Sequence, residues 1–316
     1  MTGGAGFIGS SICHDLLERG NQVVCLDNFA TGKRENIKDL KGNPGFKLIE
    51  GDIRDPETCH KAVKGVDVVL HQAALGSVPR SIADPATTNA VNINGFLNML
   101  IATRDAGIKR FVYASSSSVY GDSPELPKVE ERTGKVLSPY AITKLVNEEY
   151  ARVFGNLYGM ETIGLRYFNV FGRRQDPNGP YAAVIPKFTM AFMKYNSPVI
   201  NGDGSNSRDF TYIDNVVMAN NLAATVENPA ALNQAYNVAC GDSVNLNEMT
   251  SMLRSYLADK DPKIATVNPL HGPNRAGDIP HSMASIGKAV RLLGYNPQVL
   301  FSEGLKRAVE WYVDNL

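Results

Sequence analysis

The stretch TGGAGFIGS at residues 2–10 is the feature of this sequence that determines its fold class. It places Gly3, Gly6 and Gly9 in a three-glycine loop, and a helix is predicted to begin at about Phe7. Glycines in such a loop let the backbone approach a pyrophosphate, whose charge is met by the amides and the dipole at the helix N-terminus. A glycine-rich turn without a ligand has the same sequence, so the loop alone is weak evidence.

A loop of this kind follows a buried strand near the centre of the sheet. Only Met1 and Thr2 precede it here, which is too few residues for a strand. We therefore expect that the strand begins with residues upstream of Met1.

An acidic residue strengthens the prediction of a dinucleotide site. Asp27 ends the next predicted strand, 18 residues past Gly9, close to the spacing of about 20 at which a carboxylate binds a ribose 2′-hydroxyl. A carboxylate would repel the 2′-phosphate of NADP, so Asp27 favours NAD, although the nearby Lys33 and Arg34 leave NADP open.

The composition excludes several classes of function. The 316 residues are 43% hydrophobic, and 32 basic residues balance 32 acidic ones, so no overall charge favours nucleic acid or a membrane surface. The four cysteines form no Cys-X-X-Cys pair and the five histidines have no metal spacing, which predicts reduced thiols and no metal site. We expect a cytoplasmic protein with neither a signal peptide nor a membrane span.

Short apolar segments alternate with amphipathic ones, which predicts a parallel sheet covered by helices on both faces. The predicted strands are 21–27, 46–52, 67–74, 110–117, 161–170 and 234–240. The predicted helices lie near 10–19, 56–64, 84–106 and 139–158. The fold class is therefore α/β, a Rossmann-type doubly wound parallel sheet.

The regular alternation ends after residue 171, where Gly-, Pro- and Asn-rich stretches begin. We expect a smaller α/β substrate domain interleaved with the first. The predicted NAD-binding domain is 1–170 plus about 212–240, and the predicted substrate domain is about 171–211 plus 241–316.

A tyrosine and a lysine four residues apart, Tyr140 and Lys144 in SPYAITK, share one face of a predicted helix. An ordinary amphipathic helix has such pairs by chance. Four serines, 115–118, end the predicted strand at the sheet edge where α/β proteins bind ligands. Of these, Ser116 is our candidate for the reaction, whereas for Ser115, Ser117 and Ser118 the alternative role is to cap the following turn.

Ten motifs together resemble the extended short-chain dehydrogenase/reductases, specifically the nucleotide-sugar 4-epimerases. They occur in family order from residue 2 to residue 282: TGGAGFIGS, LDNFATG, GDIRD, HQAA, NING, SSSSVYGD, SPYAITK, LRYFNVFG, NGDGSNSRDF and RAGDIPHS. The stretches YAAVIPKF and GRRQDPNGPY are most similar to the branch that acts on UDP-N-acetylhexosamines.

The resemblance implies a catalytic set of Ser116, Tyr140 and Lys144. A tyrosine of ordinary pKa, about 10, is a poor base. An adjacent ammonium and a cationic nicotinamide both favour the phenolate, so Lys144 would activate Tyr140. Ser116 would relay the proton from the sugar 4-hydroxyl, and Lys144 would also hold the nicotinamide ribose.

The resemblance also implies two sets of binding residues. For a tightly bound NAD they are Gly3, Gly6, Phe7, Ile8, Asp27, Asn28, Gly32, Asp52, Ile53, Gln72, Ala73, Ala74, Tyr140, Lys144 and Tyr167. For the UDP-sugar they are Ser77, Ser116, Ser117, Asn169, Val184, Asn201, Arg208, Arg275, Asp278 and Ser282. Within the second set, Asn169 and the two arginines are assigned to the diphosphate, Asn201 to uracil and Asp278 to the uridine ribose.

Related activities are distinguished by the serine run. The 4,6-dehydratases carry Thr-Asp-Glu at positions 116–118, and decarboxylases tend to carry glutamate at 118, whereas this sequence has serines. A UDP-glucose/galactose or UDP-glucuronate 4-epimerase is the nearest alternative. An NAD-binding regulatory protein without activity is a distant one, since a fold does not fix a function.

Two further expectations concern the sugar and the assembly. In this family a bulky tyrosine at position 282 restricts the sugar 2-substituent, so Ser282 predicts room for an N-acetyl group; alternatively, it caps a helix beginning near Met283. The family commonly dimerises through two long helices, which here would lie within 84–106 and 139–158.

Overall fold

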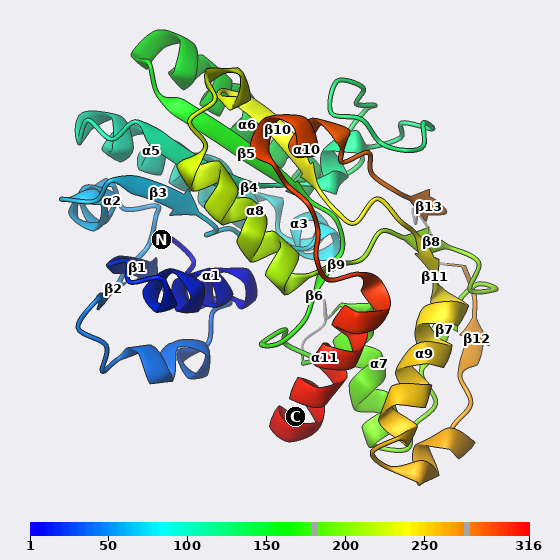
Figure 1. Ribbon diagram of the computed structural model, residues 1–316. Helices are drawn as coiled ribbons and strands as arrows, with labels where there is room; N and C mark the ends of the chain where they lie inside the picture. The colour runs from blue at the N-terminus through cyan, green and yellow to red at the C-terminus, as the bar shows by residue number, and fades with distance from the viewer. Residues whose placement is uncertain (179–182, 275–278) are drawn as a thin grey trace.

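The computed structural model describes residues 1–178, 183–274 and 279–316. Its main sheet is parallel, and Figure 1 shows it running through the upper part of the molecule. Four strands pair in the order β10-β5-β4-β3, and two more pair as β1-β2. Their bounds are β1 Val23–Asp27, β2 Phe46–Glu50, β3 Val68–His71, β4 Arg110–Ser116, β5 Glu161–Tyr167 and β10 Gln234–Val238.

The residues just before the glycine loop join these two groups of strands. Thr2 forms parallel bridges to both Leu26 of β1 and His71 of β3. The Thr2 amide donates to Leu70, and the Gly3 amide donates to Leu26 at 2.8 Å. Met1 and Thr2 thus occupy the position of the first strand, between β1 and β3, and a strand that begins upstream of them stays a prediction.

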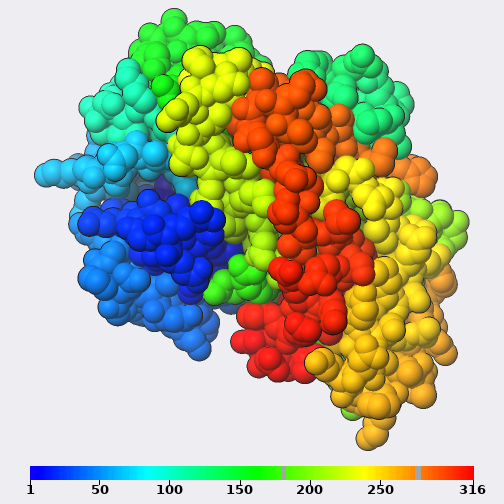
Figure 2. All heavy atoms as spheres, viewed as in Figure 1, coloured from blue at the N-terminus to red at the C-terminus, as the bar shows by residue number. Residues whose placement is uncertain are grey.

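Helices cover both faces of the main sheet, as the alternation predicts. Figure 1 shows α1 (Phe7–Glu18) and α8 (Ile213–Thr225) on one face. On the other face lie α2 (Pro56–Val63), α5 (Phe96–Asp105) and α6 (Pro139–Tyr158). Figure 2 shows the yellow-green α8 between the blue N-terminal residues and the red α11 (Phe301–Asn315).

The two faces of the sheet carry separate hydrophobic cores. Successive strand residues point to opposite faces. Accordingly, Leu70 and Val112 pack in the core beneath α1 and α8, whereas Val69 and Phe111 pack beneath α2, α5 and α6. Burial on both sides explains why these strands are continuously apolar in sequence.

The helix expected at 84–106 is interrupted. It consists of α4 (Pro85–Asn89), a π-helical turn η2 (Ala90–Gly95) and α5. The helix expected at 139–158 is confirmed with the same bounds in α6. Ser138 caps its first turn by accepting from the Ala141 amide, and Gly159 ends it at φ +63°.

The remaining segments form a second group of elements, on the lower right of Figure 1. Its short strands pair as β6 (Val170–Phe171) with β9 (Thr211–Tyr212), β7 (Val199–Asn201) with β12 (Leu270–Gly272), and β8 (Ser207–Arg208) with both β11 (Val244–Asn245) and β13 (His281–Ser282). Its helices are α7 (Val184–Met193), α9 (Leu246–Ala258) and α11. The chain returns to the main sheet at β10, but the domain boundaries stay a prediction.

Short helical elements complete the structure. They are η1 Arg34–Leu40, α3 Val78–Ala83, η3 Ser117–Tyr120, η4 Pro229–Ala231, η5 Pro262–Thr266 and α10 Gly287–Leu293. Because α10 begins at Gly287, the expectation of a helix beginning near Met283 is wrong. Ser282 instead belongs to β13, whose pairing with β8 fixes its backbone.

Candidate active site

The glycine loop is held so tightly that side chains have no room. At Gly3, where φ is +67°, a Cβ would lie 2.7 Å from the backbone nitrogen of Ala73. At Gly9 a Cβ would lie 2.0 Å from the carbonyl oxygen of Gly3. Gly6 is the N-cap of α1 and supplies no side-chain cap, so amides of the first turn lack that partner. These features fit a pyrophosphate bound against the backbone.

A cleft of about 710 Å³, partly open to solvent, lies beside this loop. It is lined by Gly3, Gly6, Leu26, Asp27, Asn28, Ala30, Thr31, Gly51, Asp52, Ile53, Arg54, Gln72, Ala73, Ala74, Leu75, Thr87 and Val91. Nine residues predicted to bind the cofactor are among them. The other six are not in the lining, although Phe7 and Ile8 begin the adjacent α1; they are Phe7, Ile8, Gly32, Tyr140, Lys144 and Tyr167.

Asp27 lies at the end of β1, as predicted, and is nearly buried. Its carboxylate accepts from the amides of Ala5 and Phe29, both at 2.8 Å. A Cβ on Gly32 would lie 3.0 Å from the same carboxylate, so Gly32 permits close packing. A carboxylate has about four acceptor positions. Asp27 therefore retains capacity for ribose hydroxyls.

A second carboxylate, that of Asp52, also lines the cleft. Asp52 forms a 2.7 Å ion pair with Arg54 and accepts from the side chain of Asn28 at 2.8 Å. The Arg54 hydrogen bond is the main reason why the pKa of Asp52 is lowered to about 2. This carboxylate is ionised at neutral pH. Arg54 also lines the cleft but was not predicted from the sequence, although it lies two residues past Asp52 in the GDIRD motif.

A ring of amide and hydroxyl groups lies where β3 and β5 end. The Tyr167 hydroxyl donates to Gln72 at 3.2 Å, and the Gln72 amide donates to Asn220 at 3.0 Å. The amide of Asn220, which is fully buried on α8, donates to Tyr167 at 2.9 Å. Sequence reasoning missed Asn220 because it lies 148 residues from Gln72 and belongs to no motif.

The three predicted catalytic residues come together at the end of β4. Ser116 is the last residue of β4, and its hydroxyl hydrogen-bonds the phenol of Tyr140. Lys144, which is 3% exposed, donates to the Ala114 carbonyl at 2.7 Å, and its Nζ lies 5.9 Å from the Tyr140 ring centroid. Tyr140 and Lys144 lie on the same face of α6.

Burial dominates the titration of this group. Desolvation raises the pKa of Tyr140, and the Ser116 hydrogen bond lowers it by less. Desolvation also lowers the pKa of Lys144 to about 8, because it disfavours the charged ammonium. The protein alone thus holds Tyr140 as a phenol at neutral pH. The expected activation of Tyr140 by Lys144 stays a prediction.

The residues predicted to bind UDP-sugar lie on other elements and do not line the cleft. Arg208 of β8 is paired in register with Ser282 of β13. Asn169 has φ +33° and donates to the Asp209 carbonyl at 3.2 Å. The other described members are Ser77 before α3, Ser117 in η3, Val184 at the start of α7 and Asn201 on β7. Arg275 and Asp278 lie outside the described residues.

The described part of the chain shows neither a metal-binding cluster nor a membrane-spanning helix. It contains no group of three or more His, Cys, Asp or Glu side chains arranged to hold a metal ion. None of its helices combines the length and apolar character needed to cross a membrane.

Comparison with known proteins identifies the family. Residues 1–239 match the NAD dependent epimerase/dehydratase family. The chain belongs to this family. Its membership confirms the predicted resemblance and the cofactor NAD, for which the glycine loop and Asp27 are suited.

Relatives match over nearly their full length. A putative UDP-glucose 4-epimerase from Methanocaldococcus jannaschii is 37% identical over 100% of this chain and 98% of its own. The UDP-N-acetylglucosamine 4-epimerase from Methanobrevibacter ruminantium, solved with UDP-N-acetylmuramic acid, is 39% identical with a TM-score of 0.92, covering 100% and 97%. A Thermus thermophilus UDP-glucose 4-epimerase solved with NAD is 35% identical with a TM-score of 0.87, covering 100% and 98%. These structures confirm the Rossmann-type fold class.

The tight loop generates a prediction for Gly9→Ala. The added Cβ would overlap the Gly3 carbonyl, so the loop must shift. We expect the free energy of unfolding, measured in urea, to fall by about 3 kcal/mol. NAD released on denaturation should fall below about one-tenth of the wild-type amount per chain.

Gly42→Ala is the matched control, because a Cβ there has no neighbour within 4 Å. It should retain both stability and NAD. Normal NAD content in Gly9→Ala would contradict the assignment of the loop to the pyrophosphate.

Proposed function

We propose that this protein is a UDP-sugar 4-epimerase whose preferred pair is UDP-N-acetylglucosamine and UDP-N-acetylgalactosamine. The observation that carries the reaction class is the convergence of Ser116, Tyr140 and Lys144 at the carboxyl end of β4. Support comes from the 4-epimerases among its relatives, which act on UDP-glucose, UDP-N-acetylglucosamine or UDP-glucuronic acid by their descriptions.

The residues divide the proton chemistry between them. Bound NAD would supply the hydride acceptor for oxidation at C4 of the sugar and the hydride donor for reduction of the 4-ketose from its other face, with no net oxidation. Tyr140 is the base that accepts the 4-hydroxyl proton, and Ser116, whose hydroxyl interacts with the Tyr140 phenol, relays that proton from the sugar to Tyr140. Because the same cofactor molecule serves both half-reactions, it stays bound throughout.

The need for an ionised Tyr140 beside a charged Lys144 gives a bell-shaped pH dependence. Burial raises the pKa of Tyr140, so its phenolate forms at working pH only where the positive charge of bound NAD offsets that rise. Lys144 has a pKa of about 8, so its ammonium is lost as pH rises above that value. The favourable combination, Tyr140 ionised beside charged Lys144, therefore has an optimum between an acidic and an alkaline limb.

The serines past β4 favour epimerisation over elimination. Ser117 and Ser118 carry no carboxylate, whereas removal of a 6-hydroxyl needs an acid and a base. Ser116 remains available to the Tyr140 phenol, although its hydroxyl also accepts from the Ser118 amide at 3.1 Å.

The preference for an acetylated sugar rests on Ser282. Ser282 is small, and its backbone pairs in register with Arg208, whose guanidinium is of the type that binds phosphate oxygens. A small side chain there leaves space for the N-acetyl group in both orientations of the ketose. UDP-glucose/galactose and UDP-glucuronate remain the alternative substrates, because relatives with those names are also similar.

We also propose a homodimer, whose interface includes α6. On this helix Ile142, Val153 and Leu157 are exposed, Leu157 at 69%. These positions fall within about 60° of one another around the helix, so they form one apolar stripe. Exposed Ile82 of the neighbouring α3 adds to it.

The reaction mechanism predicts that Tyr140→Phe lowers kcat about 100-fold or more, because only the phenolic oxygen that accepts the proton is lost. Ser116→Ala should be milder, about tenfold. An NMR assay of UDP-N-acetylglucosamine turnover measures both, with thermal unfolding and NAD content as controls for the fold. Wild-type turnover in Tyr140→Phe would end this mechanism.

The sugar preference predicts the effect of Ser282→Tyr. The ring should lower kcat/KM for the acetylated pair about 100-fold, because it opposes the larger 2-substituent, and change the unacetylated pair less than about threefold. Ser282→Ala, which adds no bulk, is the control, and its kcat/KM for both substrate pairs should stay near the wild-type value. An equal loss for both pairs in Ser282→Tyr would show that position 282 does not select the sugar.

The dimer proposal predicts that Leu157→Glu lowers the mass measured by light scattering from twice 34.3 kDa to 34.3 kDa. Burying an unpaired carboxylate in an apolar interface is unfavourable. Val290→Glu changes a side chain that is 46% exposed on α10, so it should stay dimeric. A monomeric wild type, or a dimeric Leu157→Glu, would refute the interface.

A further inference from the structure

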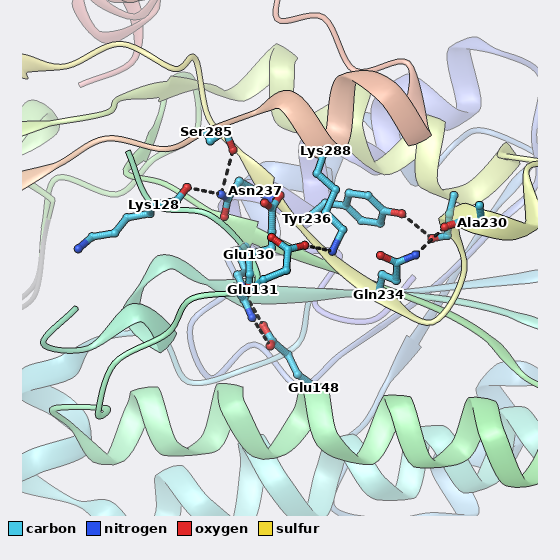
Figure 3. A network of polar contacts seen from close by, with 12 residues as sticks. Lys128, Glu130, Glu131, Glu148, Ala230, Gln234, Tyr236, Asn237, Ser285 and Lys288 are labelled. Atoms are coloured by element: carbon cyan, nitrogen blue, oxygen red, sulfur yellow. Dashed lines mark hydrogen bonds and ion pairs between the residues drawn. The ribbon is translucent and has the colours of Figure 1, made fainter. Parts of the chain in front are cut away.

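A third residue continues the helix face that carries Tyr140 and Lys144. Glu148 follows Lys144 by one turn of α6, so the three side chains lie in one row. Its side chain is only 11% exposed. Figure 3 shows Glu148 pointing from its helix toward the sheet. Neither the glycine loop nor the proposed proton transfer uses this buried carboxylate.

The Glu148 carboxylate hydrogen-bonds to side chains on two neighbouring strands, β4 and β5. Its Oε1 accepts from the Ser115 hydroxyl at 2.5 Å and from Arg166 Nε at 2.9 Å. Its Oε2 accepts from Arg166 Nη2 at 2.8 Å, so the guanidinium is held in a two-point contact. The Arg166 side chain is itself 6% exposed.

These partners immediately precede site residues. Ser115 and Arg166 are partners across the β4–β5 ladder, and the next pair is Ser116 with Tyr167. A displacement of Glu148 therefore moves α6 relative to the strand end that supplies Ser116. Since the Tyr140–Ser116 hydrogen bond crosses the same helix–strand contact, its geometry depends on the alignment.

The charge of Glu148 also acts on Lys144. The charged and titratable neighbours of Lys144 come from three elements. Tyr140 and Glu148 lie on α6, and His71 lies on β3. Arg166 of β5 is neutralised by its ion pair with Glu148. Burial lowers the pKa of His71 to about 3, so this imidazole is neutral at working pH. The other contact of the ammonium is the Ala114 carbonyl. Within the described residues, Glu148 is the group that raises the pKa of Lys144 against desolvation.

We propose that Glu148 is a positioning residue for the epimerase reaction: it aligns α6 with β4 and β5 and keeps Lys144 charged beside Tyr140. This inference rests on the proposed function. It adds to that function a reason why a buried ammonium stays protonated where the chemistry needs it.

The test separates charge from geometry with two variants. Glu148→Gln keeps groups that hydrogen-bond but removes the charge and leaves Arg166 unneutralised. Glu148→Asp keeps the charge on a shorter side chain. Glu149→Gln is the matched control, because this neighbour is 59% exposed and pairs with Arg152 at the surface.

Lys144 is titrated directly in the NAD-containing protein by ¹³C NMR of lysines labelled at Cε, with its signal assigned by its loss in Lys144→Arg. In Glu148→Gln we expect the Lys144 titration to move down by about one pH unit. The alkaline limb of kcat/KM for UDP-N-acetylglucosamine should move with it, an approximately fivefold loss at pH 8. Glu149→Gln should leave both unchanged.

Glu148→Asp should keep the titration near that of the wild type but lose about tenfold in kcat, because alignment is looser. A folded Glu148→Gln in which Lys144 titrates as in the wild type would overturn the charge claim. Unchanged kcat in Glu148→Asp would overturn the positioning claim, even if the Gln variant does not fold. A wild type that converts no UDP-sugar would instead refute the proposed function, while the NMR titration still judges Glu148.

Discussion

The alignment of α6 against the end of β4 is the constraint on which the site depends. Tyr140 belongs to the helix and Ser116 to the strand, so their hydrogen bond exists only while the two elements stay in register. Lys144 fixes one contact by donating to Ala114. Glu148 fixes a second through Ser115. All these polar groups are removed from water, so each must be paired to avoid a penalty.

The doubly wound topology explains why cofactor and catalytic groups meet. All strands of the main sheet are parallel, so their carboxyl ends share one edge. Asp27 ends β1, Gln72 follows β3, Ser116 ends β4 and Tyr167 ends β5. The dinucleotide cleft and the tyrosine–serine pair thereby occupy one side of the molecule, although their residues are far apart in sequence.

Local sequence signals predicted much of the fold and of the candidate site. The bounds of α6 were predicted because Ser138, Pro139 and Gly159 mark its ends in sequence. The glycine loop and Asp27 were predictable from their spacing, and the family motifs supplied the catalytic residues. The interruption of the helix expected at 84–106 was not predictable, because no local sequence signal marks the π-helical turn.

Other features depend on tertiary contacts that no short motif encodes. Asn220 reaches the site only because α8 crosses the sheet beside β5, and Glu148 gains its partners only through packing. The same limit applies to electrostatics. The family resemblance implied that Lys144 activates Tyr140, whereas the depth of burial, visible only in the fold, raises the pKa of the phenol.

Transfer of the C4 hydrogen tests the central claim most directly. UDP-N-acetylglucosamine deuterated at C4 is incubated with the purified protein in ordinary water, and the product is analysed by ¹H NMR. The account predicts UDP-N-acetylgalactosamine that retains deuterium at C4, because hydride leaves and returns within one site. Product with hydrogen from water at C4, or no product from any UDP-sugar, would contradict it.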